Sequence, residues 1–165
     1  MKLNGVGSSA IKQDALAKVT GQALFAADMK RPGMLFCKVV RNETAIVHAI
    51  IEEIDVSEAA DYPGVVAVFT AKDVPGPNGV GIIIKDEPIL AGDKIRRHGD
   101  AIALVVAETE EIAIAAGKKV RAKLKELPAY FDPESAMAPD AVKIHGSSNV
   151  LTLRKVRKGD VEAGF

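Results

Sequence analysis

The sequence predicts a mixed α/β fold of the α+β kind, in which a mixed sheet packs against two or more helices. Short apolar segments typical of strands recur along the chain, two segments begin with helix-capping residues, and Gly and Pro separate them. The 165 residues suffice for one domain with a sizeable core. Because aromatic residues make up only 4% and Trp is absent, we expect that core to be aliphatic.

The predicted strands are short and mainly apolar. Met34–Arg41 follows the turn residues Pro32 and Gly33. Its side chains alternate, so we expect Cys37 and Val39 on one face and their neighbours on the other. The other predicted strands are 48–56, 65–71, 101–108 as the central strand, 128–137 at an edge, and 149–156.

Capping residues predict the helices. Ser57 can accept a hydrogen bond from the first turn of a short helix at 58–62, which resembles a small crossover unit together with the strands around it. Thr109 is placed to cap a longer helix at 110–127. Asp160 resembles the cap of a helix that has barely begun, which suggests a piece of a longer chain. The basic residues of the longer helix favour a solvated face over a nucleic-acid patch: Lys118, Lys119, Arg121, Lys123 and Lys125.

Three parts of the chain are predicted to differ in organisation. Residues 1–13 are small and polar, as in a flexible lead-in, 14–138 form the domain, and 139–165 form a linker. Within the domain, 72–94 is rich in Pro and Gly and predicts a long loop with a short strand or two. Near its start, Lys18–Gly21 predict a turn and Asp28 a cap or turn contact.

Composition argues against several classes of partner. Lys plus Arg and Asp plus Glu both total 22, so no net charge attracts nucleic acid or an anionic membrane. The single cysteine, Cys37, excludes an intrachain disulfide. The longest apolar runs are far shorter than the roughly 20 residues of a spanning helix. The start of the chain lacks the apolar region of a signal peptide, so we expect a cytoplasmic protein.

The residues that could carry chemistry do not form a recognisable site. The three histidines, at positions 48, 98 and 145, are far apart in sequence, which favours structural or surface roles, although folding could still bring them together. Cys37 alternates within a strand and is read as a small core residue. Gly76–Gly81 lacks the Lys-Ser/Thr ending of a phosphate loop. The adjacent pairs Glu52/Glu53 and Asp86/Glu87 would face opposite sides of a strand, and the first pair indicates a solvated edge. We therefore predict no catalytic, cofactor-binding or metal-binding residue.

Five stretches in order resemble one known family. They are KVTGQALFAAD at 18–28, RPGMLFCKVVRN at 31–42, the segment 48–78 with its IDVSEA and PGVVAVFTAKDVPG runs, the segment 86–109, and RKGDVEAGF at 157–165. Together they resemble the N-terminal a/b hammerhead domain of the large, molybdopterin-binding subunit of xanthine dehydrogenases and aldehyde oxidoreductases. His98 and Asn42 depart mildly from the family pattern and bear on local packing.

The resemblance implies a module that packs against the first cofactor-binding domain near the iron-sulfur portion. It implies that the molybdenum pterin and the glutamate base lie downstream, so this segment would bind no cofactor itself. The parent enzyme would use molybdenum-pterin, iron-sulfur centres and often FAD. The segment would scaffold the large subunit and would be inactive alone.

Two other hypotheses remain open at this point. One is a free-standing binding or interaction module without a molybdenum partner, and the other is a self-contained enzyme. Whether the chain is an enzyme in its own right, and which substrate it serves, is left open by the sequence. If 142–165 normally crosses onto another domain, its apolar residues would be exposed in isolation, and the segment would be mobile or would pair with a second copy.

Overall fold

The computed structural model describes residues 7, 9, 11–82 and 84–165. The chain divides into two compact units, residues 1–34 and residues 35–165. The first contains helix α1, Ala15–Val19, and the 3-10 turn η1, Ala26–Asp28. The Asp28 carboxylate accepts from the Phe25 N–H at 2.9 Å, which confirms the contact predicted for it. Gly21 follows α1 at φ +71°, a left-handed conformation that suits glycine and closes the predicted turn.

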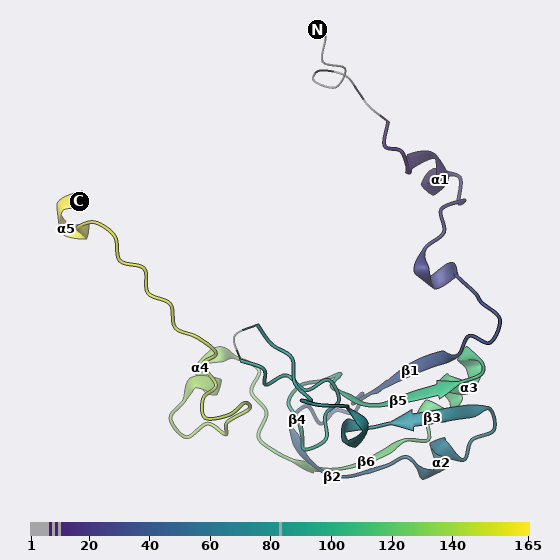
Figure 1. Ribbon diagram of the computed structural model, residues 1–165. Helices are drawn as coiled ribbons and strands as arrows, with labels where there is room; N and C mark the ends of the chain where they lie inside the picture. The colour runs from purple at the N-terminus through teal and green to yellow at the C-terminus, as the bar shows by residue number, and fades with distance from the viewer. Residues whose placement is uncertain (1–6, 8, 10, 83) are drawn as a thin grey trace. The chain divides into compact units, whose positions relative to one another are not determined.

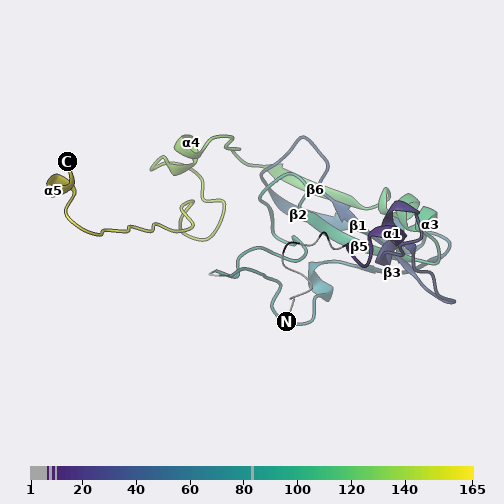
Figure 2. The ribbon, with the colours of Figure 1, turned by 90° about the horizontal axis from the view of Figure 1, so that it is seen from above.

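The second unit contains two three-stranded antiparallel sheets (Figures 1 and 2). In sheet A the strand order is β1-β5-β3, and in sheet B it is β4-β2-β6. The strands are β1 Phe36–Arg41, β2 Ala49–Asp55, β3 Val65–Phe69, β4 Lys94–Ile95, β5 Ala101–Ala107 and β6 Arg121–Glu126. These strands and the helices around them confirm the mixed α/β prediction.

Sheet A is built around β5, as its apolar run predicted. Lys38 and Val105 lie opposite each other on the face that packs against helix α3, Glu110–Gly117. Cys37 and Val39 lie on the other face, so the predicted alternation of β1 is confirmed. The pairing of β1 with β5 passes over Ile102, and this bulge places Ile102 and Ala103 together in the core.

The predicted crossover unit of strand, short helix and strand is wrong, because its two strands lie in different sheets. β2 and β3 belong to different sheets, so the short helix between them, α2 at Ser57–Ala60, connects the sheets and does not cross over within one. The first half of β2 is central, because β4 pairs with Ala49 and Ile50 only. Its second half pairs with β6 alone. Glu52 lies in this half, at a bulge, and its exposure agrees with the predicted solvated edge.

The longer helix is much shorter than predicted. Thr109 caps α3 as expected, accepting from the Ile112 N–H at 3.3 Å, but the helix ends at Gly117. Residues 121–126 form β6, in which Ala122 and Leu124 are half-buried while the basic residues between them are exposed. The basic residues are therefore solvated as predicted, but mostly on a strand. In 121–126 the basic residues recur at every second position, which indicates a strand. Apolar residues also recur at i, i+4 spacing through this region, and that helical pattern concealed the strand signal.

Of the two other predicted helix caps, the one at Ser57 is wrong and the one at Asp160 is confirmed. Ser57 does not accept at the start of α2; its N–H and hydroxyl both donate to Asp55 Oδ1, at 2.9 and 2.7 Å. Asp160 does cap a final turn, α5 at Val161–Gly164.

Two predicted strands are absent from the described residues. The segment predicted as an edge strand at 128–137 contains helix α4, Pro133–Met137, because Asp132 caps it and Pro133 suits its first position. Residues 149–156 carry no strand pairing, and 150–165 are exposed throughout. The long loop at 72–94 is confirmed, with one bridge between Val80 and Glu87 and the short β4 at its end.

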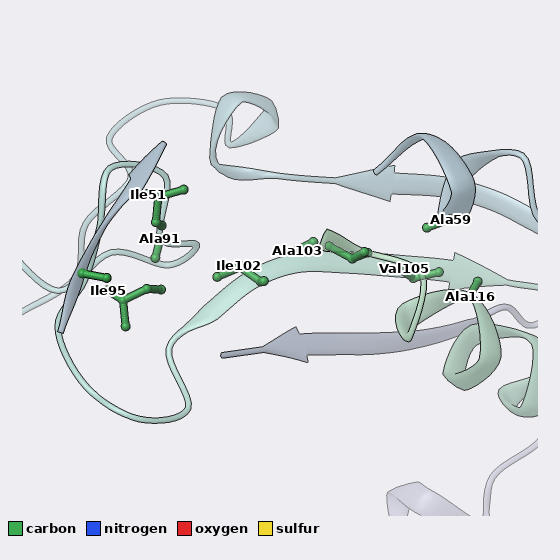
Figure 3. Close-up of a cluster of buried hydrophobic side chains, with 10 residues drawn as sticks. Ile51, Ala59, Ala91, Ile95, Ile102, Ala103, Val105 and Ala116 are labelled. Atoms are coloured by element: carbon green, nitrogen blue, oxygen red, sulfur yellow. The ribbon is translucent and has the colours of Figure 1, made fainter. Parts of the chain in front are cut away.

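The core lies between the two sheets and beneath the helices, and its buried members are all Ala, Ile or Val, as predicted. Figure 3 shows Ile51 and Ile95 on one side and Ile102 and Val105 on the other. Small alanines let the elements approach closely, and Gly117 allows α3 to approach β1: a Cβ there would lie 3.3 Å from side-chain atoms of Lys38 and Val40. Among the described residues, no helix is long and apolar enough to cross a membrane.

Truncating Ile95 should test how strongly the stability of the folded chain depends on this core. Ile95 is fully buried in sheet B, whereas its neighbour on the paired strand, Ile50, is 39% exposed. We expect I95A to lower the free energy of unfolding in urea by about 2–5 kcal/mol, because it leaves a cavity that the core closes only partly. I50A is the matched control and should cost clearly less. Equal losses for the two variants would contradict the proposed core.

Candidate functional site

Buried polar side chains hold the loops of the second unit, and sequence reasoning missed them. Asn42 is 4% exposed, and its amide donates to the Ile46 carbonyl at 2.7 Å. Its backbone N–H donates to the Asp100 carbonyl at 2.8 Å. The Asp100 carboxylate accepts from the backbone N–H groups of Arg96 and Arg97 at 2.7 and 3.3 Å. The connections that follow β1 and precede β5 are thus tied together.

The long loop has its own polar centre at Asn78. Its amide donates to the Leu90 carbonyl at 2.7 Å, and its amide oxygen accepts from the N–H groups of Ile89 and Leu90 at 3.0 and 3.1 Å. Glycine is required at Gly81, because a Cβ there would lie 1.8 Å from the Ile84 carbonyl oxygen. The glycines at 76–81 thus serve a tight loop. Asn beside Gly and Pro was the available signal for such a side chain.

His48 lies on the outer face of sheet B and is 3% exposed. Its backbone carbonyl accepts from the Leu127 N–H at 2.9 Å, and its ring Nδ1 lies 2.5 Å from the Pro128 carbonyl oxygen. Since a carbonyl can only accept, Nδ1 must carry a hydrogen. The other ring nitrogen, Nε2, is buried and has no hydrogen-bond partner among the described residues. An unpartnered buried polar group costs about 1–3 kcal/mol.

Arg96 lies directly opposite His48, because β2 and β4 pair Ala49 with Ile95. Its Nε is a second buried atom without a hydrogen-bond partner, while its terminal nitrogens reach Asp93 at 3.3 Å and the Lys94 carbonyl at 3.2 Å. A cavity of about 230 Å³ adjoins these side chains. We call it the His48 pocket, and its lining residues include Val47, His48, Arg96, Arg97, His98 and Tyr130. Folding therefore brings two of the three scattered histidines together.

The third histidine, His145, lies at a separate pocket of about 560 Å³. Its Nδ1 is 3.2 Å from the Asp86 carboxylate, close enough for an ion pair but not aligned as a hydrogen bond. Glu87, the neighbour of Asp86, pairs instead with Arg97. These two adjacent carboxylates thus have different partners and do not form an acid/base pair.

Cys37 is not the core residue that the sequence predicted. It is exposed, because it lies on the face of sheet A opposite α3. Its neighbours on that face are largely apolar and half-exposed: Val39, Ala67, Phe69, Leu104 and Val106. Glu52 is also exposed, and its carboxylate pairs with Lys123 at 3.1 Å. Among residues 7, 9, 11–82 and 84–165, no group of three or more His, Cys, Asp or Glu side chains could hold a metal ion.

Three exposed carboxylates at turns are held in the ionised form by hydrogen bonds. The side-chain and backbone hydrogen bonds from Ser57 lower the pKa of Asp55 below its ordinary value. Backbone and side-chain hydrogen bonds from Thr70 do the same to the pKa of Asp73. At the start of α4, those from Ser135 lower the pKa of Asp132. Their arrangement fixes turns, and it places no nucleophile beside a base.

The comparisons with known proteins decide the family. The sequence model described as "Aldehyde oxidase and xanthine dehydrogenase, a/b hammerhead domain" matches residues 20–128. The chain belongs to this family. The match covers most of the chain, including all six strands and α3, so the resemblance to this family is confirmed, while the fifth stretch, 157–165, lies outside the matched residues.

The relatives of this hammerhead domain are longer proteins. The chain is 45% identical over 157 residues to a probable xanthine dehydrogenase component of Bacillus subtilis, covering 95% of this chain and 21% of the relative. It is 42% identical to the nicotinate dehydrogenase large molybdopterin subunit of Eubacterium barkeri, covering 97% of this chain and 37% of that protein. The chain thus spans about a fifth to two fifths of these relatives.

Solved structures show the same fold. The aldehyde oxidoreductase of Desulfovibrio desulfuricans superposes with a TM-score of 0.78 at 40% identity, over 86% of this chain and 17% of that one. A Cu,Mo-CO dehydrogenase superposes with a TM-score of 0.76 at 34% identity, over 86% of this chain and 18% of that one. In the present hammerhead domain, Asn42, Asn78 and Asp100 all lie within residues 20–128. The side chains whose hydrogen bonds hold the loops therefore belong to the part of the chain that matches the family.

The carboxylate of Asp132 should give the hammerhead domain a measurable acid response. Its pKa is lowered from 3.8 in the folded state, so the stability it contributes is present above about 3.8 and is lost as the pH falls through the lower, folded value. We expect the Ser135 amide signal in NMR to titrate with a midpoint below 3.8. D132N should abolish this titration and D140N, a change in an exposed carboxylate, should retain it. A midpoint at or above 3.8 would contradict the cap.

Proposed function

We propose that this chain is the N-terminal structural domain of the large subunit of a molybdenum hydroxylase of the xanthine dehydrogenase and aldehyde oxidoreductase type. One observation carries the proposal: nearly the whole chain matches a minor part of much longer relatives, one of which is named a large molybdopterin subunit. In this role the chain scaffolds neighbouring domains and performs no catalysis alone.

We propose an organisation in three parts, and the match to longer relatives supports it. Residues 14–138 are the hammerhead domain, 1–13 lead into it, and 139–165 connect it to downstream molybdopterin-binding domains. The iron-sulfur component is the second proposed partner, and a cytoplasmic location stays a prediction. The apolar open face of sheet A supports a packing role, because a contiguous exposed apolar surface is typical of an interface.

The proposed cofactors of the parent enzyme are molybdenum-pterin, iron-sulfur centres and often FAD, and none is assigned to this segment. The bound molybdenum centre would supply the hydroxylation chemistry. The residues of this chain contribute rigidity instead: the core between the sheets and the ties at Asn42 and Asp100 hold the surfaces on which other domains pack.

Recovery of the complete reading frame tests the proposal. We expect a frame that continues, or is adjoined by another, into cofactor-binding domains, and we expect the whole protein to contain stoichiometric molybdenum. The 165-residue chain purified alone is the control and should contain none. A closed frame beside unrelated genes would contradict the proposal and favour a free-standing interaction module. Turnover of aldehydes or purines by the chain alone would instead indicate a self-contained enzyme.

The end of the chain should associate when no other domain covers it. Val150, Leu151, Leu153 and Val156 are exposed, and residues 151–158 make no backbone–backbone hydrogen bond with another described residue. We expect 150–158 to exchange amide hydrogens rapidly in the monomer and the chain to dimerise with concentration in sedimentation experiments. L151S/L153S should weaken that association, and I11S, at an exposed residue near the other end, should not. Strong amide protection of this segment in a strict monomer would contradict the prediction.

A further inference from the structure

We propose that the His48 pocket binds a small oxyanion that retains a proton at neutral pH, with inorganic phosphate as its probe. The pocket lies on the outer face of sheet B, beneath residues 129–131 and Ile144, and is separate from the aliphatic core. Its volume of about 230 Å³ exceeds severalfold the roughly 30 Å³ that one water occupies in the liquid, so a tetrahedral oxyanion fits.

The two unpartnered atoms define the chemistry of the ligand. Because Nδ1 of His48 donates to the Pro128 carbonyl, the neutral ring presents Nε2 as an acceptor that lacks a donor. Nε of Arg96 is a donor that lacks an acceptor. A ligand that satisfies both must offer one O–H and one anionic oxygen. Hydrogen phosphate and bicarbonate offer both, whereas sulfate at neutral pH offers only anionic oxygens.

The pocket is lined by cationic side chains, but its surroundings carry no net positive charge, so hydrogen bonding must select the ligand. Arg96, Arg97 and His98 line it, and no carboxylate does. Three carboxylates pair with these arginines from outside the lining: Asp93 with Arg96, and Glu87 and Asp100 with Arg97. Among the described residues His98 has no hydrogen-bond or ion-pair partner, so its ring is available to a bound anion.

Entry requires movement at the rim, because Nε2 of His48 and Nε of Arg96 are enclosed. Phe131 and His98 both line the pocket and are exposed, so movement of these two side chains does not disturb the core. Binding then relieves two unsatisfied polar groups, which ordinary surface binding of phosphate does not do.

Titration of the 165-residue chain with sodium phosphate, sodium bicarbonate and sodium sulfate at constant ionic strength and pH 7.5 tests the site. We expect saturable binding of phosphate by calorimetry, with bicarbonate also binding and sulfate at least about tenfold weaker, since it cannot donate to Nε2. In NMR, the His48 ring Nε2 signal should shift with the same dissociation constant. Equal binding of phosphate and sulfate would show an adventitious ion only and overturn the proposal.

Two matched variants distinguish phosphate binding in the His48 pocket from nonspecific attraction by positive charge. R96K keeps the positive charge but removes the Nε donor, and we expect it to weaken phosphate binding about tenfold. R121K makes the same change on β6 of the same sheet, outside the pocket, and should bind as the unaltered chain does. Equal affinities for R96K and R121K would overturn the proposal. If R96K does not fold, an unmoved His48 Nε2 signal in the unaltered chain overturns it as well.

Discussion

The packing of aliphatic side chains between two separate sheets is the constraint on which this structure depends. No strand of sheet A pairs with a strand of sheet B, so backbone hydrogen bonds stabilise each sheet but not their association. Ile51 and Ile95 from one sheet meet Ile102 and Val105 from the other in a single cluster. The relation of the sheets to each other is therefore set by apolar contacts that act without direction.

Directional contacts are supplied by a few buried polar groups at the ends of the strands. Asn42 and Asp100 fix the chain where it passes between the sheets, and the half-buried Asn78 fixes the long loop that precedes β4. His48 and Arg96 differ, because each retains an unsatisfied atom. Among the described residues the third such atom is Nδ1 of His145, which lies 3.2 Å from the Asp86 carboxylate, so only His48 and Arg96 bring unsatisfied atoms together on the outer face of sheet B.

Much of the fold could be predicted from local sequence, because alternation and capping act over few residues. β1, β5 and the Thr109 cap follow from such patterns. The end of α3 at Gly117 was missed because an apolar row at helical spacing continues into β6, where pairing with β2 decides the conformation. The exposure of Cys37 could not be predicted either, since alternation separates two faces without saying which one is covered.

The candidate site was beyond sequence reasoning for a related reason. His48 and Arg96 meet only because the antiparallel register of β2 and β4 sets them opposite each other, although they are 48 positions apart in the sequence. Register is a property of the assembled sheet. The family could be recognised from ordered motifs, whereas the pocket required coordinates.

The bulges at Glu52 and Val66 have a consequence for how this protein avoids unwanted partners. Both lie in strand segments that pair on one side only, and each interrupts the regular spacing of N–H and C=O groups along the free side. A foreign strand would find no continuous template there. These two strand segments are thus protected against edge-to-edge pairing by their own irregularity, whereas the extended residues 150–158, which belong to no strand, have no such protection.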